Sequence, residues 1–163
     1  MFENIDWIAV VVLGIGATLL LDVWSIVLAK VFAVSSLNFC LVGRWVSLMR
    51  TGQFRHTAIG KATAQNKECA LGWVIHYLIG IIFALVFLII MPSNWSYSPS
   101  FWQALLFGLI TVCIPFFVMQ PALGLGIAAR NTKKPVHARA KSCASHCVFG
   151  AGLYLSTLVL TLF

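Results

Sequence analysis

Residues 7–29 read WIAVVVLGIGATLLLDVWSIVLA, an apolar run whose one charged side chain is Asp22. The hydrocarbon core of a bilayer is about 30 Å thick and takes about 20 helical residues at 1.5 Å each, so this run is long enough to cross it. Three more runs of this kind follow, over residues 69–91, 101–129 and 142–163. The sequence therefore predicts an all-α integral membrane four-helix bundle, in a single transmembrane domain over residues 1–163.

The composition agrees with a membrane protein and excludes a soluble globular domain. Hydrophobic residues make up 61% of the chain, charged residues make up only 9%, and the mean hydropathy is +0.97. Soluble domains carry roughly a quarter charged residues. The net charge of +7 comes from cations that flank apolar runs. Because this pattern is typical of membrane loops, we expect no nucleic-acid partner.

All lysines and arginines lie in two loops, residues 30–68 and 130–141. The positive-inside rule predicts that both loops face the cytoplasm, and both termini then lie outside. Within the second loop, Pro135 is predicted to open the fourth helix, whose apolar part begins at residue 142. We also expect an outer belt of interfacial aromatic residues made of Trp7, Trp95, Tyr97 and Trp102.

The first loop contains another apolar segment, residues 37–49, that is too short to cross a membrane. We expect it to form a short interfacial helix on the cytoplasmic side, ended by Gly52. Two interpretations stay open, because the segment either anchors this face of the bundle or helps to bind an anionic lipid or a partner protein. The residues of that predicted contact are Arg44, Arg50, Arg55, His56 and Lys61.

Asp22 is the clearest candidate for a functional residue inside a span. A carboxylate near the middle of a membrane costs at least about 2.5 kcal/mol on insertion scales, so it should face protein, water or a bound cation. Thr18 and Ser25 lie at helical spacing from Asp22 and extend a polar stripe on the same side of the helix. The stripe predicts an inward-facing proton or cation site, although Asp22 can also serve only to join helices.

Three further polar residues, His76, Gln120 and His146, are predicted to share this depth. Counting from the flanking charges at 1.5 Å per residue puts each of them in the cytoplasmic half of the bundle if the helices are straight. Gln120 also lies in the run 115–121, where two prolines predict a broken helix of the kind that lines a cavity. These residues and Asp22 are therefore predicted to form one cluster, although each histidine can equally be an interhelical hydrogen-bond donor.

A haem or a metal ion is an alternative occupant of this region. His76 and His146 lie on different predicted helices and could be the axial ligands of a haem, or join Asp22 in a carboxylate and two-histidine metal site. Cys143 and Cys147 flank His146 at helical spacing and could add soft ligands. The sequence does not name a cofactor.

The cysteines have a simpler interpretation as small packing residues. Cys40, Cys69 and Cys143 are predicted to lie near the cytoplasmic, reducing side of the membrane. Because disulfides are rare in a reducing compartment, we expect none among these cysteines.

Several runs carry a resemblance to a known family: residues 14–22, 43–45, 52–56, 72–73 with 76–77, 115–126 and 142–154. The chain resembles a family of small bacterial inner-membrane proteins catalogued as a domain of unknown function. The resemblance covers most of the chain and implies a four-helix protein of the bacterial inner (cytoplasmic) membrane, with no established activity. The polar residues within or beside these runs are Asp22, Arg44, His56, Glu68, His76, Gln120 and His146.

Three classes of function stay open. The intramembrane polar residues and the predicted helix break favour a small transport or ion-handling protein. A haem- or metal-binding redox protein and a non-catalytic accessory subunit are the alternatives. Four helices enclose little room, so a transporter of this size is predicted to act as a homo-oligomer or within a larger membrane complex. The absence of a nucleotide motif or a hydrolytic triad from the sequence weakens other enzyme classes.

Overall fold

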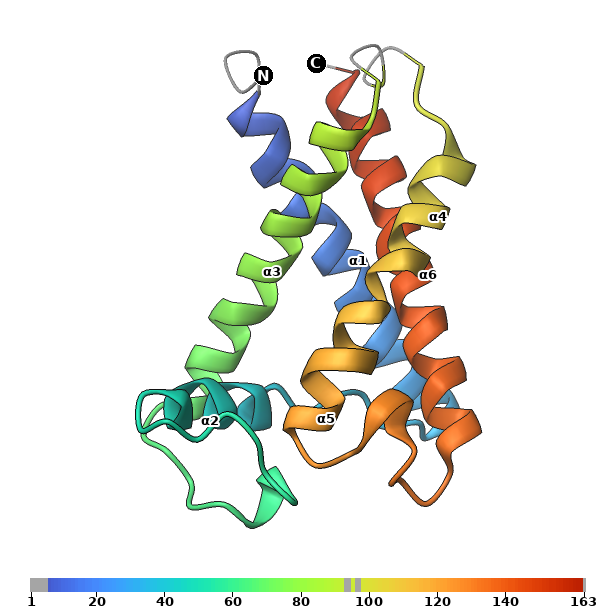
Figure 1. Ribbon diagram of the computed structural model, residues 1–163. Helices are drawn as coiled ribbons and strands as arrows, with labels where there is room; N and C mark the ends of the chain where they lie inside the picture. Colours follow the sequence, from blue (N-terminus) through green and yellow to red (C-terminus); the bar gives the residue numbers. More distant parts are fainter. Residues whose placement is uncertain (1–5, 93–94, 96–97, 163) are drawn as a thin grey trace. The chain divides into compact units, whose positions relative to one another are not determined.

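The computed structural model describes residues 6–92, 95 and 98–162 (Figure 1). In chain order its helices are α1 (Trp7–Phe32), α2 (Phe39–Met49), η1 (Ile59–Lys61), α3 (Glu68–Ile90), α4 (Phe101–Thr111), η2 (Pro115–Met119), α5 (Gln120–Ala122), η3 (Ile127–Ala129) and α6 (Pro135–Leu160). Four segments are long and apolar enough to cross a membrane: Trp7–Phe32, Glu68–Ile90, Phe101–Ala122 and Pro135–Leu160. The predicted all-α, four-span fold is confirmed, and so is a short helix between the first two spans.

The third span is shorter than predicted. It ends at Ala122 rather than at residue 129. The chain turns there because Gly124 and Gly126 have φ angles of 90° and 73°, which residues with a side chain rarely adopt. At the other end of this loop α6 begins at Pro135, as predicted, since a proline in the first turn of a helix forfeits no backbone hydrogen bond.

The spans expose most of their apolar residues, as contact with lipid requires. In the most apolar stretch of α1 only 28% of the residues are buried inside the protein, and in the corresponding stretch of α3 only 17% are buried. Val23 on α1 and Val74 on α3 are 56% and 63% exposed. An exposed apolar surface of this extent is typical of a membrane-facing helix.

The chain forms two compact units. Unit 1 comprises Met1–Ser36, Tyr77–Thr111 and Ala144–Phe163, and unit 2 comprises Leu37–His76 and Val112–Cys143. The helices α3 and α6 therefore contribute residues to both units.

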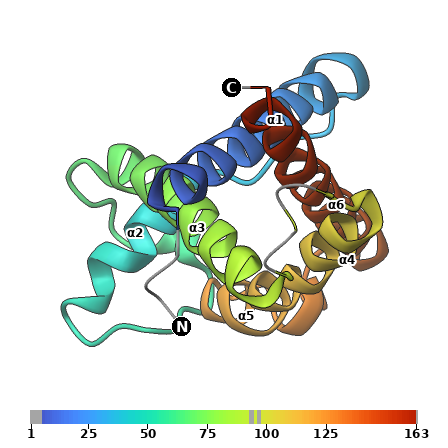
Figure 2. The ribbon, with the colours of Figure 1, turned by 90° about the horizontal axis from the view of Figure 1, so that it is seen from above.

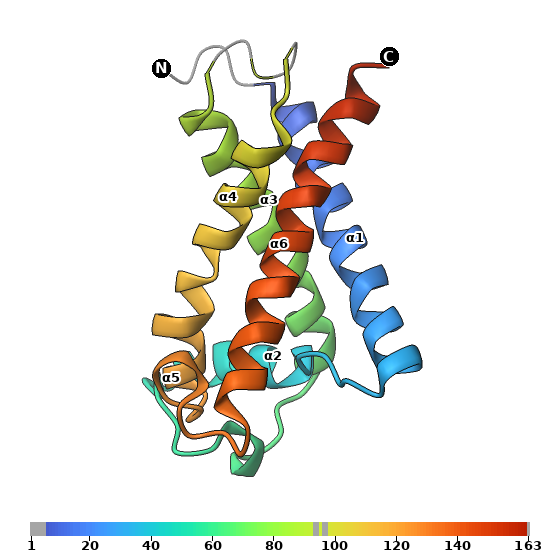
Figure 3. The ribbon, with the colours of Figure 1, turned by 90° about the vertical axis from the view of Figure 1, so that its right-hand side faces the viewer.

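Unit 1 is a packed group of four helical segments that alternate in direction (Figures 1 and 3). Small residues let their backbones approach closely. A Cβ atom added to Gly152 of α6 would lie 2.6 Å from the Cα of Ala17 on α1, and one added to Gly108 of α4 would lie 2.7 Å from the Cα of Gly150 on α6. Gly14 of α1 makes a similar approach to α3, which crosses it in Figure 2. Close packing of this kind is what joins helices in lipid, where no hydrophobic effect drives them together.

An aromatic cluster fills one part of unit 1. The ring of Phe87 lies 4.9 Å from that of Trp95 and 5.0 Å from that of Phe107, between centroids. Trp95 is only 3% exposed, and its indole N–H donates to the Thr157 hydroxyl at 3.3 Å. The prediction that Trp95 belongs to an interfacial belt is therefore wrong, because its polar atom finds a partner inside the protein. Trp7 and Trp102 are exposed, as a belt requires, and Tyr97 lies outside the described residues.

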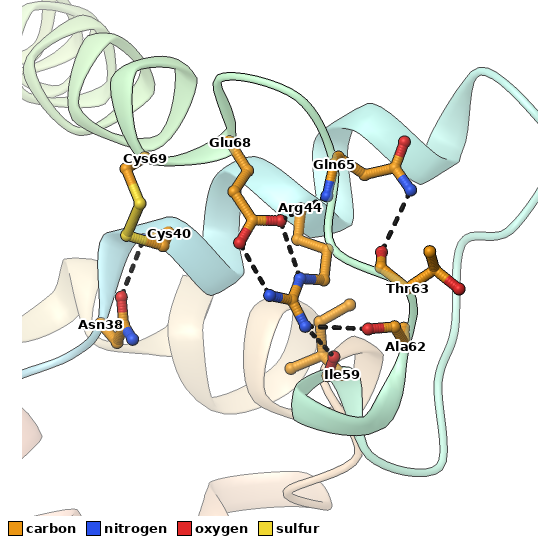
Figure 4. A network of polar contacts seen from close by, with 9 residues as sticks. All are labelled: Asn38, Cys40, Arg44, Ile59, Ala62, Thr63, Gln65, Glu68 and Cys69. Atoms are coloured by element: carbon orange, nitrogen blue, oxygen red, sulfur yellow. Dashed lines mark hydrogen bonds and ion pairs between the residues drawn. A yellow bond between two sulfur atoms is a disulfide. The ribbon is translucent and has the colours of Figure 1, made fainter.

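In unit 2 the short helix α2 is joined to the start of α3 by a disulfide between Cys40 and Cys69 (Figure 4). The expectation that these cysteines are unpaired is wrong. The physical reason is a backbone contact, because a Cβ atom added to Gly43 of α2 would overlap the Glu68 carbonyl group, and one added to Gly72 of α3 would overlap that of Phe39. Because no side chain separates the backbones at these two glycines, the two cysteine Cα atoms come within 3.8 Å of each other.

Candidate functional site

Asp22 lies within the α1 span and is half-buried. The hydroxyl group of Tyr77 donates a hydrogen bond to its carboxylate at 2.8 Å, and both residues belong to unit 1. Thr18, one turn earlier, is buried, and its hydroxyl donates to the Gly14 carbonyl at 2.7 Å within the same helix. Ser25, on the other side of Asp22, is half-buried. The predicted stripe therefore faces protein at Thr18, and Asp22 provides its charged group.

His146 of α6 pairs with Thr111 of α4, also within unit 1. The Thr111 oxygen lies 2.7 Å from His146 Nδ1, and its hydroxyl donates to the Gly108 carbonyl. Because a hydroxyl group has one proton to donate, this arrangement favours the tautomer in which His146 Nδ1–H donates to Thr111. His146 therefore links two spans.

Gln120 lies beside an unusual turn of the third span. Residues Pro115–Met119 form a turn of π-helix, so the predicted break is a local widening after which the helix continues to Ala122. Gln120 is 6% exposed, and its side-chain N–H group donates to the Ser142 hydroxyl at 3.4 Å. Its side-chain oxygen is buried without a hydrogen-bond partner among the described residues. An unpaired buried acceptor is costly, and π turns are frequent at functional sites.

His76 lies in unit 2 among aromatic rings. Its imidazole stacks on Phe39 of α2 with the ring centroids 4.0 Å apart, and it meets Trp73 edge to face with the ring centroids 5.7 Å apart. These contacts join α3 to the short helix α2.

Arg44 and Glu68 form the polar centre of unit 2 (Figure 4). The guanidinium group donates to both carboxylate oxygens, at 2.8 and 2.7 Å, and also to the backbone carbonyl of Ala62 at 2.9 Å. Both side chains are largely buried, with exposed fractions of 13% and 12%. Hydrogen bonding to Glu68 raises the pKa of Arg44. Arg44 therefore holds the loop after α2 against the start of α3.

The other predicted lipid-contact residues lie in different surroundings. Arg50 and Lys61 are exposed. Arg55 and His56 instead line a pocket of about 450 Å³ in unit 2, together with Arg130 and Asn131 from the loop before α6. Sequence reasoning missed these last two residues, although the two glycines that shape the turn before them were a usable signal.

The chain matches the sequence pattern of one known protein family. The sequence pattern of a family described as "Protein of unknown function (DUF2938)" matches residues 11–160. The chain belongs to the DUF2938 family. Neither a curated protein nor a solved structure matches it.

The predicted cluster of this DUF2938 protein divides between the two units. Asp22 and His146 belong to unit 1, and His76 and Gln120 belong to unit 2. The buried polar side chains of the described residues are all uncharged, namely Thr18, Ser47, Thr111, Gln120 and Thr157. The described part of the chain thus contains no buried cluster of charged groups.

The described part of the DUF2938 chain brings no set of metal ligands together. Among the described residues, no three His, Cys, Asp or Glu side chains gather closely enough to hold a metal ion. Cys143 and Cys147, the predicted soft ligands, are half-buried and take no part in the disulfide.

Proposed function

We propose that this protein handles a proton or a small cation within the membrane, with the Asp22 carboxylate as the ion-binding group. The observation that carries the proposal is the hydrogen bond from the Tyr77 hydroxyl to Asp22 inside an apolar span. An ionisable side chain at such a position is expensive to keep and is usually retained for function.

The chemistry of the pair suits this role. A carboxylate can take up a proton or provide oxygen ligands to a cation. A phenolic hydroxyl can donate to the charged carboxylate and rotate to accept from the protonated one. The Asp22–Tyr77 pair therefore offers two protonation states without a change of fold.

We propose that the remaining predicted residues contribute further polar groups to the handling of the proton or cation. Gln120 supports this through its unpaired buried oxygen, and His146 through its hydrogen bond to Thr111. Thr18, Ser25 and His76 complete the proposed set. We also propose that the protein acts as a homo-oligomer or within a larger complex, since four helices enclose little room.

The proposed location is the bacterial inner membrane with both termini outside. The cations in loops 30–68 and 130–141 support this orientation.

Flux through reconstituted vesicles tests the proposal. The purified protein is placed in vesicles that enclose a pH-sensitive dye, and an imposed K⁺ diffusion potential or Na⁺ gradient drives ion movement. We expect wild-type vesicles to change internal pH faster than protein-free vesicles. Asp22→Asn should return the rate to that of protein-free vesicles, and Tyr77→Phe should lower it less.

Asp6→Asn is the matched control. Asp6 is also acidic, but it caps the start of α1 by accepting from the N–H groups of Ile8 and Ala9. Asparagine caps a helix as well as aspartate does, so this variant should transport like the wild type. Equal rates for Asp22→Asn and wild type, or no flux above protein-free vesicles under either gradient, would overturn the proposal.

A further inference from the structure

We propose that the pocket in unit 2 binds a phosphate-bearing anion between Arg55 and Arg130. This site is separate from Asp22 and Tyr77, which belong to unit 1. The proposal therefore stands or falls independently of ion handling.

The pocket is built by backbone contacts between two segments far apart in the sequence. The N–H of His56 donates to the carbonyl of Ala122 at 2.8 Å, and the N–H of Ile59 donates to that of Leu123 at 3.1 Å. Gly124, with φ of 90°, lies so close to the Thr57 carbonyl that a Cβ atom would overlap it. These contacts hold the loop after α2 against the turn that ends the third span, so the pocket walls are formed before any ligand binds.

The charge of the pocket is uncompensated. The guanidinium groups of Arg55 and Arg130 have no hydrogen-bond or ion-pair partner among the described residues, in contrast to that of Arg44, which is paired with Glu68. Among the residues that the structure describes, none with an acidic side chain lines the pocket. His56 lines the same pocket, and its Nε2 atom is buried without a partner within the described part of the chain.

The donor groups that line the pocket suit a phosphate in kind and in number. A guanidinium group carries N–H donors in a planar fork that binds two oxygens of one phosphate. Arg55 and Arg130 supply two such forks, and the side-chain amide of Asn131 adds a neutral donor. The volume of about 450 Å³ leaves room for a group attached to the phosphate.

The position of the pocket favours a ligand at the membrane surface. Phe117 and Ile127 also line the pocket and are 60% and 47% exposed. Phe117 belongs to the last turns of a membrane span that ends at Ala122, so this apolar side lies where a span leaves the hydrocarbon core. Lipid phosphates and free phosphate both reach this depth, and cationic pockets there bind either.

Binding to the full-length protein in a nonionic detergent tests the site. One arm measures retention of phosphatidylglycerol by native mass spectrometry, and the other measures binding of inorganic phosphate and pyrophosphate by calorimetry. For the probe that binds, the double variant R55Q/R130Q should lose at least about tenfold in affinity, since each charged hydrogen bond contributes about that factor. Both arginines are exposed, so the variant should fold like the wild type.

The variant K133Q/K134Q is the matched control because it also removes two positive charges, both from the loop that holds Arg130, without touching the pocket. It should leave binding within about twofold of wild type, as expected for distant screened charges. Binding of the lipid alone identifies a headgroup site, binding of phosphate or pyrophosphate alone identifies a soluble ligand, and mutual competition identifies one site open to both. Absence of binding in both arms, or equal losses in the two double variants, would overturn the proposal.

Discussion

Arg44 and Arg55 show how one residue type takes two roles within unit 2. The donors of Arg44 are occupied by the Glu68 carboxylate and by backbone carbonyl groups at the loop after α2. Arg55 is exposed and lines a pocket with no acidic residue. At the residue scale, the first arginine is therefore a structural group, and the second is available to a ligand.

Loss of the Arg44–Glu68 pair should destabilise unit 2. Arg44→Met and Glu68→Gln are each expected to lower the melting temperature of the purified protein by several degrees, because the remaining group loses its partner in largely buried surroundings. The double variant should lose less than the sum of the two single losses. Arg50→Met is the control, since Arg50 is exposed at the end of the same helix. Additive losses, measured by thermal unfolding in detergent, would show that the pair is not coupled.

Close backbone contacts decide the structure at the scale of helices. Gly43 and Gly72 allow α2 and α3 to touch, and Gly108 and Gly150 do the same for α4 and α6. The π turn of Pro115–Met119 is another feature at this scale, because the third span stays helical through it and past Pro121 to Ala122.

The disulfide between α2 and α3 predicts a count of reactive thiols. Protein purified without a reducing agent should take up three alkyl groups on denaturation, at Cys113, Cys143 and Cys147, and five after reduction. Loss of the crosslink should cost about 2–4 kcal/mol of unfolding free energy.

Gly72→Ala tests the physical reason for this crosslink. The added methyl group overlaps the Phe39 carbonyl and pushes the helices apart, so alkylation without reduction should rise towards five groups. Gly60→Ala is the control, because a Cβ atom there meets no neighbour within 4 Å. An unchanged count in Gly72→Ala would mean that the close approach does not govern pairing.

At the scale of the whole molecule, the charges and the disulfide point to different compartments. The lysines and arginines in loops 30–68 and 130–141 predict that these loops are cytoplasmic. A disulfide between Cys40 and Cys69 is typical of an oxidising compartment. We expect the orientation that the charges predict, because charged loops direct insertion into the membrane. A disulfide, in contrast, forms or stays open according to the redox state of its compartment.

Reporter fusions and thiol trapping check the orientation. Alkaline phosphatase fused after Phe163 should be active, because it folds only outside the cytoplasm, and a fluorescent protein placed after Thr132 should be fluorescent. Thiols trapped with N-ethylmaleimide in intact cells should number five, because the reducing cytoplasm keeps Cys40 and Cys69 as free thiols. Three trapped thiols and an inactive phosphatase would show that the protein has the opposite orientation, with both loops outside the cytoplasm.

The sequence by itself determined the fold class, the number of spans and the short helix after the first span. These properties are local, because the length and hydropathy of a run such as residues 7–29 can be read from that run alone. It also singled out Asp22 as a polar residue inside a span. The end of the third span at Ala122 was harder to predict, because an apolar run continues past the glycines that turn the chain.

Only the tertiary structure decided which residues meet. Arg44 finds Glu68, Cys40 finds Cys69, and Trp95 finds Thr157, at sequence separations of 24, 29 and 62 residues. The pocket around Arg55 likewise needs the loop after α2 to pack on Gly124. Such pairings depend on how closely the backbones of two segments far apart in the sequence come together. Hydropathy and helical spacing carry no information about that distance.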